Sequence, residues 1–190
     1  MVISVRLYLT LLALVGAERL FELWLSKRHA RRAFARGAVE TGQAHFRVMS
    51  AVHTLFLFSC AAEVMALHRP FPGALGWAAL AGVLGAQGLR YWAVATLGER
   101  WNVRILVVPG APPVTSGPYR FVRHPNYVAV VAEMILLPLV HGAWLTAALF
   151  SLVNAALLRV RIRAEENALG EAYAHAFAHR PRFLPSLRRS

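Results

Sequence analysis

Cysteine is nearly absent from this 190-residue sequence, and so are the spacings that bind metals. The one cysteine, Cys60, lies inside an apolar run, so no disulfide framework and no paired-cysteine metal site can form within one chain. His124, Glu165 and Glu166 are possible metal ligands, but their spacing matches no recognisable metal motif. The sequence therefore predicts no metal.

Acidic residues are also scarce, with 9 Asp and Glu against 21 Lys and Arg, for a formal net charge of +12. Such an excess can indicate nucleic-acid binding. Here the basic residues stand between and after long apolar runs rather than along one soluble face. They are better interpreted as topology signals and as contacts to anionic lipids. We therefore expect membrane lipids, and no nucleic acid, as partners.

Apolar residues make up 57% of the chain, and the mean hydropathy is +0.47, which is high for a soluble globular protein. The pattern predicts an all-α, polytopic integral membrane protein in one domain, residues 1–190. The first apolar segment has no small-residue cleavage site followed by a soluble domain, so we expect it to be retained. About five membrane-spanning helices are predicted, at residues 2–25, 46–67, 74–97, 127–140 and 144–158.

The last two apolar segments are short, so we interpret them as a tight helical hairpin. A polar helix over Ala164–Ala178 and a basic tail over residues 180–190 follow it. Residues 1–97 would form the three N-terminal spans, and residues 98–190 the catalytic portion. Basic residues follow the first span at once and recur at residues 159–163, which by the positive-inside rule places these ends in the cytoplasm. We expect a protein of the cell inner membrane with its N-terminus outside and its catalytic loop and C-terminus in the cytoplasm.

The hydrophobicity drops from Gly98 to Tyr127, and the glycines and prolines of this stretch exclude a continuous helix. Irregular backbone of this length beside a membrane suggests a site. Pro125 suits the first position of a helix. Free N–H groups at that helix start, with Arg120, Arg123 and His124 beside them, predict a binding site for an anionic ligand group.

Arg161 and Glu165 are one helical turn apart and face the same way, whereas Glu166 is rotated by roughly 100°. One interpretation is an exposed ion pair worth about 0.3 to 0.5 kcal/mol. The other is an acid and a base at the mouth of a membrane cavity. We favour the second, because the pair directly follows the hydrophobic hairpin as it returns towards the loop.

Two motifs carry a resemblance to a known family. GPYRFVRHPNY (residues 117–127) followed by an apolar helix, and RIRAEENAL (residues 161–169), together resemble the isoprenylcysteine carboxyl methyltransferase family. The match covers roughly Leu89 to Pro185. The family consists of multi-span membrane enzymes that transfer a methyl group from S-adenosylmethionine to a lipophilic acceptor. The similarity is strongest to a bacterial branch found beside type III polyketide synthases, which is associated with O-methylation of long-chain phenolic or pyrone lipids.

The resemblance also implies roles for individual residues. The cofactor-binding residues would be Val114, Thr115, Tyr119, His124, Pro125, Tyr127 and Glu166. The catalytic residues Arg161 and Glu165 would face a lipophilic small-molecule acceptor from the bilayer, although the two glutamates are not securely separated. Arg161 would orient a carboxylate acceptor, whereas Glu165 would take the proton of a phenol or enol.

Other functions stay open. The alternatives are methylation of a prenylated thiol acid, an NADPH-dependent membrane lipid reductase, and a non-catalytic lipid-binding protein. The oligomeric state is not predicted. Five polar residues within the first three spans have no assigned role at this point, namely Glu18, Glu22, Glu63, Gln87 and Arg90.

Overall fold

The computed structural model describes residues 2–183, so the last part of the basic tail, residues 184–190, lies outside the described residues. The elements in chain order are α1 (Val2–Ala35), β1 (Val39–Thr41), α2 (Gln43–Ala66), α3 (Ala74–Leu97), the short 3₁₀ helix η1 (Gly98–Arg100), β2 (Ile105–Val107), the 3₁₀ helix η2 (Gly117–Arg120), α4 (Pro125–Leu139) and α5 (Trp144–Ala176).

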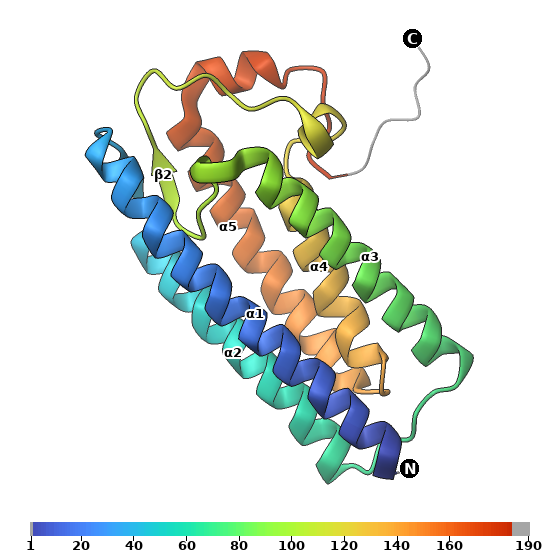
Figure 1. Cartoon of the computed structure of the whole chain (residues 1–190). Helices are drawn as coiled ribbons and strands as arrows, with labels where there is room; N and C mark the ends of the chain where they lie inside the picture. Colours follow the sequence, from blue (N-terminus) through green and yellow to red (C-terminus); the bar gives the residue numbers. More distant parts are fainter. Residues whose placement is uncertain (1, 184–190) are drawn as a thin grey trace.

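The α-helices lie side by side in an elongated bundle (Figure 1). Helix α1 packs on α2, α3 packs on α4, and α5 contacts both α2 and α4. The largest apolar core joins all five helices through side chains such as Leu12, Phe56, Val83, Leu137 and Phe150. The N-terminus lies at one end of the bundle. The loop between α3 and α4, the two strands and the end of α5 lie at the other, which we call the loop end (Figure 1).

Several predicted bounds are confirmed. Helix α3 spans the predicted residues 74–97, and α4 begins at Pro125. The division of the chain into N-terminal spans, residues 1–97, and a catalytic portion, residues 98–190, stays a prediction. These helices agree with the prediction because their apolar runs are bounded by residues that stop helices, such as Gly73 and Gly98, both with positive φ.

Two predicted bounds are wrong. Helix α1 continues past residue 25 through the basic stretch to Ala35, since Lys, Arg and Ala are good helix formers and the first positive-φ glycine is Gly37. Helix α5 does not stop at residue 158. It passes into the segment predicted as a separate helix, and the helical backbone breaks only at Gly170, with φ 70°.

The expectation of an all-α chain needs one correction. Strands β1 and β2 form a small antiparallel sheet in which Val39 pairs with Val107 and Thr41 with Ile105. The ion pair between Arg104 and Glu40, at 3.0 Å, supports it. Each strand has three residues, too few for a recognisable alternation in sequence. The sheet ties the α1–α2 connection to the long loop.

The prediction of five membrane spans is supported only in part. Among the described residues, two helices are long and apolar enough to cross a membrane by length and composition, α2 over Phe46–Ala66 and α5. Helix α4 is apolar but shorter. By length and composition, two such helices fit a membrane protein but also the packed core of a helical bundle, and the five-span topology stays a prediction.

Glu63 at the end of α2 caps the start of α5. Its carboxylate accepts hydrogen bonds from the N–H groups of Leu145 and Thr146, at 3.2 and 2.7 Å, and from the Thr146 hydroxyl at 2.8 Å. Arg69 donates two more, at 2.9 and 3.1 Å. The residue before the helix, Ala143, has no polar side chain with which to cap it. Glu63 therefore has a structural role.

We expect Glu63→Ala to lower the free energy of unfolding by about 2 to 4 kcal/mol, because two helix N–H groups and Arg69 lose a charged acceptor. Unfolding of the detergent-solubilised protein followed by circular dichroism measures this. Glu171→Ala, at an exposed position of α5, is the matched control. Equal stability of the two variants would show that the cap is dispensable.

Candidate active site

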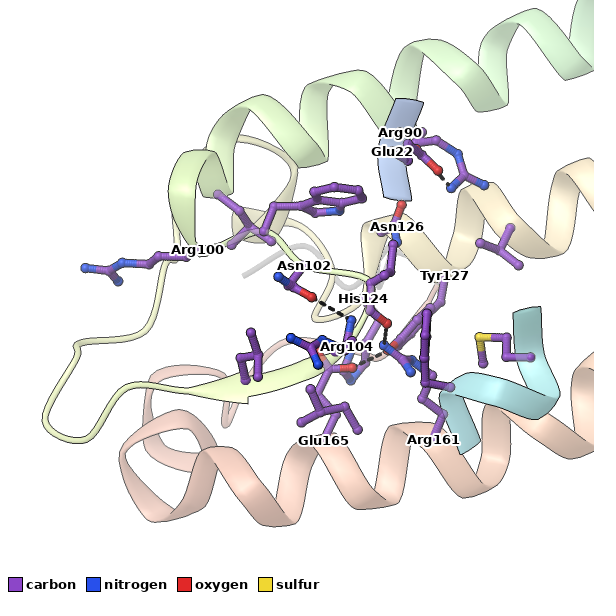
Figure 2. Close-up of a pocket in the computed structure, with 18 of the residues that line it drawn as sticks. Glu22, Arg90, Arg100, Asn102, Arg104, His124, Asn126, Tyr127, Arg161 and Glu165 are labelled. Carbon is purple, nitrogen blue, oxygen red and sulfur yellow. Dashed lines mark hydrogen bonds and ion pairs between the residues drawn. The ribbon is translucent and has the colours of Figure 1, made fainter. Parts of the chain in front are cut away.

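A cavity of about 1200 Å³ runs from the loop end into the apolar part of the bundle. Its polar lining includes Asn102, His124, Asn126, Tyr127, Arg161 and Glu165 (Figure 2). Its apolar lining includes Leu12, Leu57, Ala61 and Val130. A molecule with a polar head and an apolar body fits such a space.

Arg161 of α5 is the buried cation at the polar end of the cavity, with 5% of its surface exposed. Its Nε donates to the Tyr127 hydroxyl at 2.9 Å, and one Nη atom donates to the carbonyl of Val103 at 2.6 Å. The other, Nη1, is buried without a partner among the described residues. Buried guanidinium nitrogens are normally satisfied, so this one is available to a ligand oxygen.

Tyr127 of α4 stands between Arg161 and Glu165. Its hydroxyl accepts from Arg161 and donates to Glu165 Oε2. A direct ion pair between Arg161 and Glu165 is not among the contacts of the described residues, so the simple exposed pair is not what forms. Both side chains line the cavity, as the shared helix face predicts.

Glu166 is turned away from Glu165 and holds His124. One carboxylate oxygen lies 3.1 Å from His124 Nε2. Arg182 donates to both oxygens, at 3.0 and 2.6 Å. The His124 ring stacks on Tyr127 with centroids 5.3 Å apart. Glu166 thus fixes a ring that faces the cavity.

The start of α4 has fewer free donors than predicted. The N–H groups of Arg123 and His124 donate to the carbonyls of Pro181 and Arg182, at 2.9 and 3.1 Å. Those of Tyr127 and Val128 both donate to the His124 carbonyl. The C-terminal segment therefore occupies much of the anion-binding site that the sequence predicts at the start of α4.

Six of the nine predicted site residues line the cavity, namely Val114, Tyr119, His124, Tyr127, Arg161 and Glu165. The other three do not belong to its lining, namely Thr115, Pro125 and Glu166. Pro125 is buried at the first turn of α4, where it starts the helix. Burial raises the pKa of the Tyr119 hydroxyl, so this group stays protonated at neutral pH.

The loop end is fastened to α1 by contacts that sequence reasoning missed. Asn102 accepts from the Ser26 hydroxyl at 2.8 Å and donates to the Ser26 carbonyl at 2.8 Å. Its side-chain oxygen also accepts from the N–H of Arg104. Val103, whose carbonyl holds Arg161, therefore sits in a fixed turn. These partners are 76 residues apart, and no local pattern pairs them.

A second polar cluster lies deeper in the bundle, between α1, α3 and α4. Its members are Glu18, Arg19, Glu22, Gln87, Arg90 and Glu133. Four of the residues to which the sequence assigns no role, Glu18, Glu22, Gln87 and Arg90, thus lie together in one cluster. Glu133 was missed, because a single glutamate in an apolar helix gives no spacing signal. The described residues hold no cluster of three or more metal-ligating side chains.

Comparisons with known proteins agree with the motifs. The model of the isoprenylcysteine carboxyl methyltransferase (ICMT) family matches residues 77–171, which include both motifs. The chain is 42% identical over 162 residues to a Bacillus subtilis protein named "Uncharacterized protein YpbQ", which covers 85% of this chain and 95% of that protein. It is 29% identical to an uncharacterized protein of Haemophilus influenzae, covering 85% of this chain and 94% of that protein.

We expect Asn102→Leu to loosen the turn that holds Arg161. Amide hydrogen exchange over residues 101–106 should speed up about tenfold, the factor that corresponds to roughly 1.4 kcal/mol of lost local stability. Lys27→Leu, at an exposed position beside Ser26, is the control and should leave exchange unchanged. Unaltered exchange in the Asn102 variant would mean that other contacts fix the turn.

Proposed function

The chain belongs to the isoprenylcysteine carboxyl methyltransferase family, and on that basis we propose that it transfers a methyl group from S-adenosylmethionine to an oxygen of a lipophilic acceptor. Membership makes it a membrane methyltransferase. The observation that carries the finer proposal is the continuous cavity, which is polar around Arg161 and apolar inside the bundle. A lipid with a reactive polar head matches both parts.

The lining of the polar end fits the proposed cofactor. Tyr119, His124, Tyr127 and Tyr173 all line the cavity, and aromatic faces attract organic cations. The side-chain oxygen of Asn126, which also lines it, is buried without a partner among residues 2–183 and would accept a hydrogen bond from an amino group. Together with Val114, these residues would hold the donor. Glu166 would act through His124 rather than by direct contact.

The bound donor supplies a methyl group that its positively charged sulfur has already activated. The protein therefore has to align the acceptor oxygen with that carbon and exclude water. Arg161, fixed by Tyr127 and the Val103 carbonyl, directs Nη1 at the acceptor oxygen. Its position is set before the acceptor arrives, so little ordering remains for the reaction itself.

The role of Glu165 depends on the acceptor. A carboxylate acceptor has already lost its proton, so Arg161 alone would orient it. A phenol or enol would pass its proton to Glu165. Oε2 accepts from Tyr127, so Oε1 is the oxygen that takes this proton. We propose the second case, with a long-chain phenolic or pyrone lipid as acceptor, on the resemblance to the bacterial branch.

The distribution of charge supports a cytoplasmic site. Basic residues at the end of α1 and at residues 159–163 lie toward the loop end, where the polar part of the cavity also lies (Figure 1). By the positive-inside rule we propose the inner membrane, with the N-terminus outside and the loop end in the cytoplasm. The donor would enter from the cytoplasm and the acceptor from the bilayer.

The donor is tested by calorimetry with S-adenosylhomocysteine and, separately, NADPH. We expect binding of the first alone, weakened about tenfold by His124→Ala because a ring of the binding wall is lost. His175→Ala, at an exposed position, is the control. Binding of NADPH alone would favour the reductase. Binding of neither to folded protein, with altered liposome attachment of the His124 variant, would favour a non-catalytic lipid-binding protein.

Arg161→Gln should reduce methyl transfer to a pentadecylphenol acceptor by about 100-fold, the usual loss for one preorganised donor, while S-adenosylhomocysteine affinity changes little. Arg163→Gln, two residues along at an exposed position, should retain activity. Radiolabelled transfer and calorimetry on the same samples give the two readouts. A full loss of cofactor affinity in the Arg161 variant would show that Arg161 binds the methyl donor rather than the methyl acceptor.

Glu165→Gln distinguishes the two acceptor chemistries. Without a base, only the ionised phenol reacts, so with a phenol of pKa about 10 the rate should rise about tenfold per pH unit from neutral pH. The wild-type rate should be much flatter over the same range, because the carboxylate already accepts the proton. Parallel pH profiles for the two proteins would show that Glu165 is not the base.

A further inference from the structure

The second polar cluster is built from three helices, and its members Glu22, Arg90 and Glu133 are buried. Arg90 of α3 lies 2.9 Å from Glu133 of α4 and 3.6 Å from Glu22 of α1. Arg19 of α1 lies 2.7 Å from Glu22 and 3.5 Å from Glu133. It also contacts Glu18, at 3.1 Å. These contacts join α1, α3 and α4 across the interior.

Ion pairing alone does not explain the composition of this cluster. With every group ionised, three carboxylates face two guanidinium groups, which leaves one net negative charge inside the bundle. A cluster that only joined helices would be more stable with equal numbers of positive and negative groups, because an uncompensated buried charge is strongly destabilising. Ionisable groups at such depth usually mark a functional site.

Unpaired polar atoms point in the same direction. Arg90 is 4% exposed, and its Nε has no hydrogen-bond partner among residues 2–183. The Nε of Arg19 is buried without one in the same part of the chain. Both arginines line the cavity, as does Glu22. A ligand oxygen in the cavity could satisfy a donor that the fold leaves open.

The cluster is reached from the candidate active site along one face of α4. Asn126, Val130 and Glu133 stand at i, i+4 and i+7, so they share a stripe of the helix. Asn126 and Val130 line the cavity, and Glu133 contacts Arg90 at the far end of the stripe. Figure 2 shows Glu22 and Arg90 beyond Asn126, on the side away from Arg161.

We propose that Arg19, Glu22 and Arg90 form a second polar subsite, which binds an uncharged hydroxyl or carbonyl oxygen of the acceptor lipid. The open Nε groups donate to that oxygen, and Glu22 accepts from it when it is a hydroxyl. A second anionic group is disfavoured by the net negative charge. This subsite rests on the proposed function, because the lipid in the cavity is taken to be the methyl acceptor. It specifies the substrate class as a lipid with two separate oxygen functions.

The subsite is tested by binding, without cofactor, so that methyl transfer is not needed for the result. The probes are pentadecylphenol, pentadecylresorcinol and a pentadecylphenol with a hydroxyl in mid-chain. These share one chain and differ in the number and place of hydroxyls. We expect at least one two-oxygen probe to bind about tenfold more tightly than pentadecylphenol, the change expected of one charge-assisted hydrogen bond. Equal affinities for all three would overturn the proposal.

Variants of Glu22 and Glu18 test whether the preference for a two-oxygen probe comes from a residue that lines the cavity. Glu22→Met should bring the two-oxygen probe close to the affinity of pentadecylphenol, and Glu22→Gln should restore part of the difference. Glu18→Met is the matched control, because it removes the same charge from the same cluster at a position that does not line the cavity. The preference for the two-oxygen probe should persist in the Glu18→Met variant. Equal loss in both Met variants would make the cluster structural.

Two further readouts keep the outcomes separate. Thermal unfolding of each variant identifies those that fold, and Arg90→Gln replaces the Glu22→Met variant if that one does not fold. S-adenosylhomocysteine binding is measured on the same samples. Uptake of that molecule together with equal affinity for all probes contradicts the second subsite and leaves methyl transfer standing. A two-oxygen preference without any uptake of it contradicts methyl transfer and leaves the subsite standing.

Discussion

The guanidinium group of Arg161 is the contact on which the loop end depends. It joins α5 to α4 through the Tyr127 hydroxyl and to the long loop through the Val103 carbonyl. A buried cation needs such partners, because without them its desolvation would not be offset. Its Nη1 is still without a partner among the described residues, and the side chain lines the cavity. Arg161 therefore both joins the elements of the loop end and is the side chain proposed to orient the acceptor.

The charged groups of the bundle interior are few, and their placement separates structure from function. Glu63 is surrounded by donors from Arg69 and the start of α5, so its carboxylate oxygens already accept hydrogen bonds from the protein. Arg161 and Arg90 each keep a nitrogen that has no partner among residues 2–183, and both side chains line the cavity. Burial is similar for all three, so the difference lies in unused hydrogen bonds. Open donors beside an apolar space are the feature that suits a lipid with polar groups.

The sequence predicted what local patterns determine. Apolar runs gave α2, α3 and the α4–α5 hairpin, Pro125 gave the start of α4, and helical periodicity placed Arg161 beside Glu165 on the cavity. It did not predict contacts between distant segments. The bonds from Ser26 to Asn102 join different parts of the chain, and the two three-residue strands show no periodicity. A lone polar residue such as Glu133 acquires meaning only once α1 and α3 lie against it.

Glu165 and Glu166 illustrate how adjacent identical residues acquire different roles. A rotation of roughly 100° per residue turns one carboxylate to the cavity and the other to the loop and the C-terminal segment. Glu165 meets Tyr127, whereas Glu166 meets His124 and Arg182. Neither can replace the other without turning the helix. The segment around Arg182 therefore belongs to the support of the site, since it holds the carboxylate that holds the histidine ring.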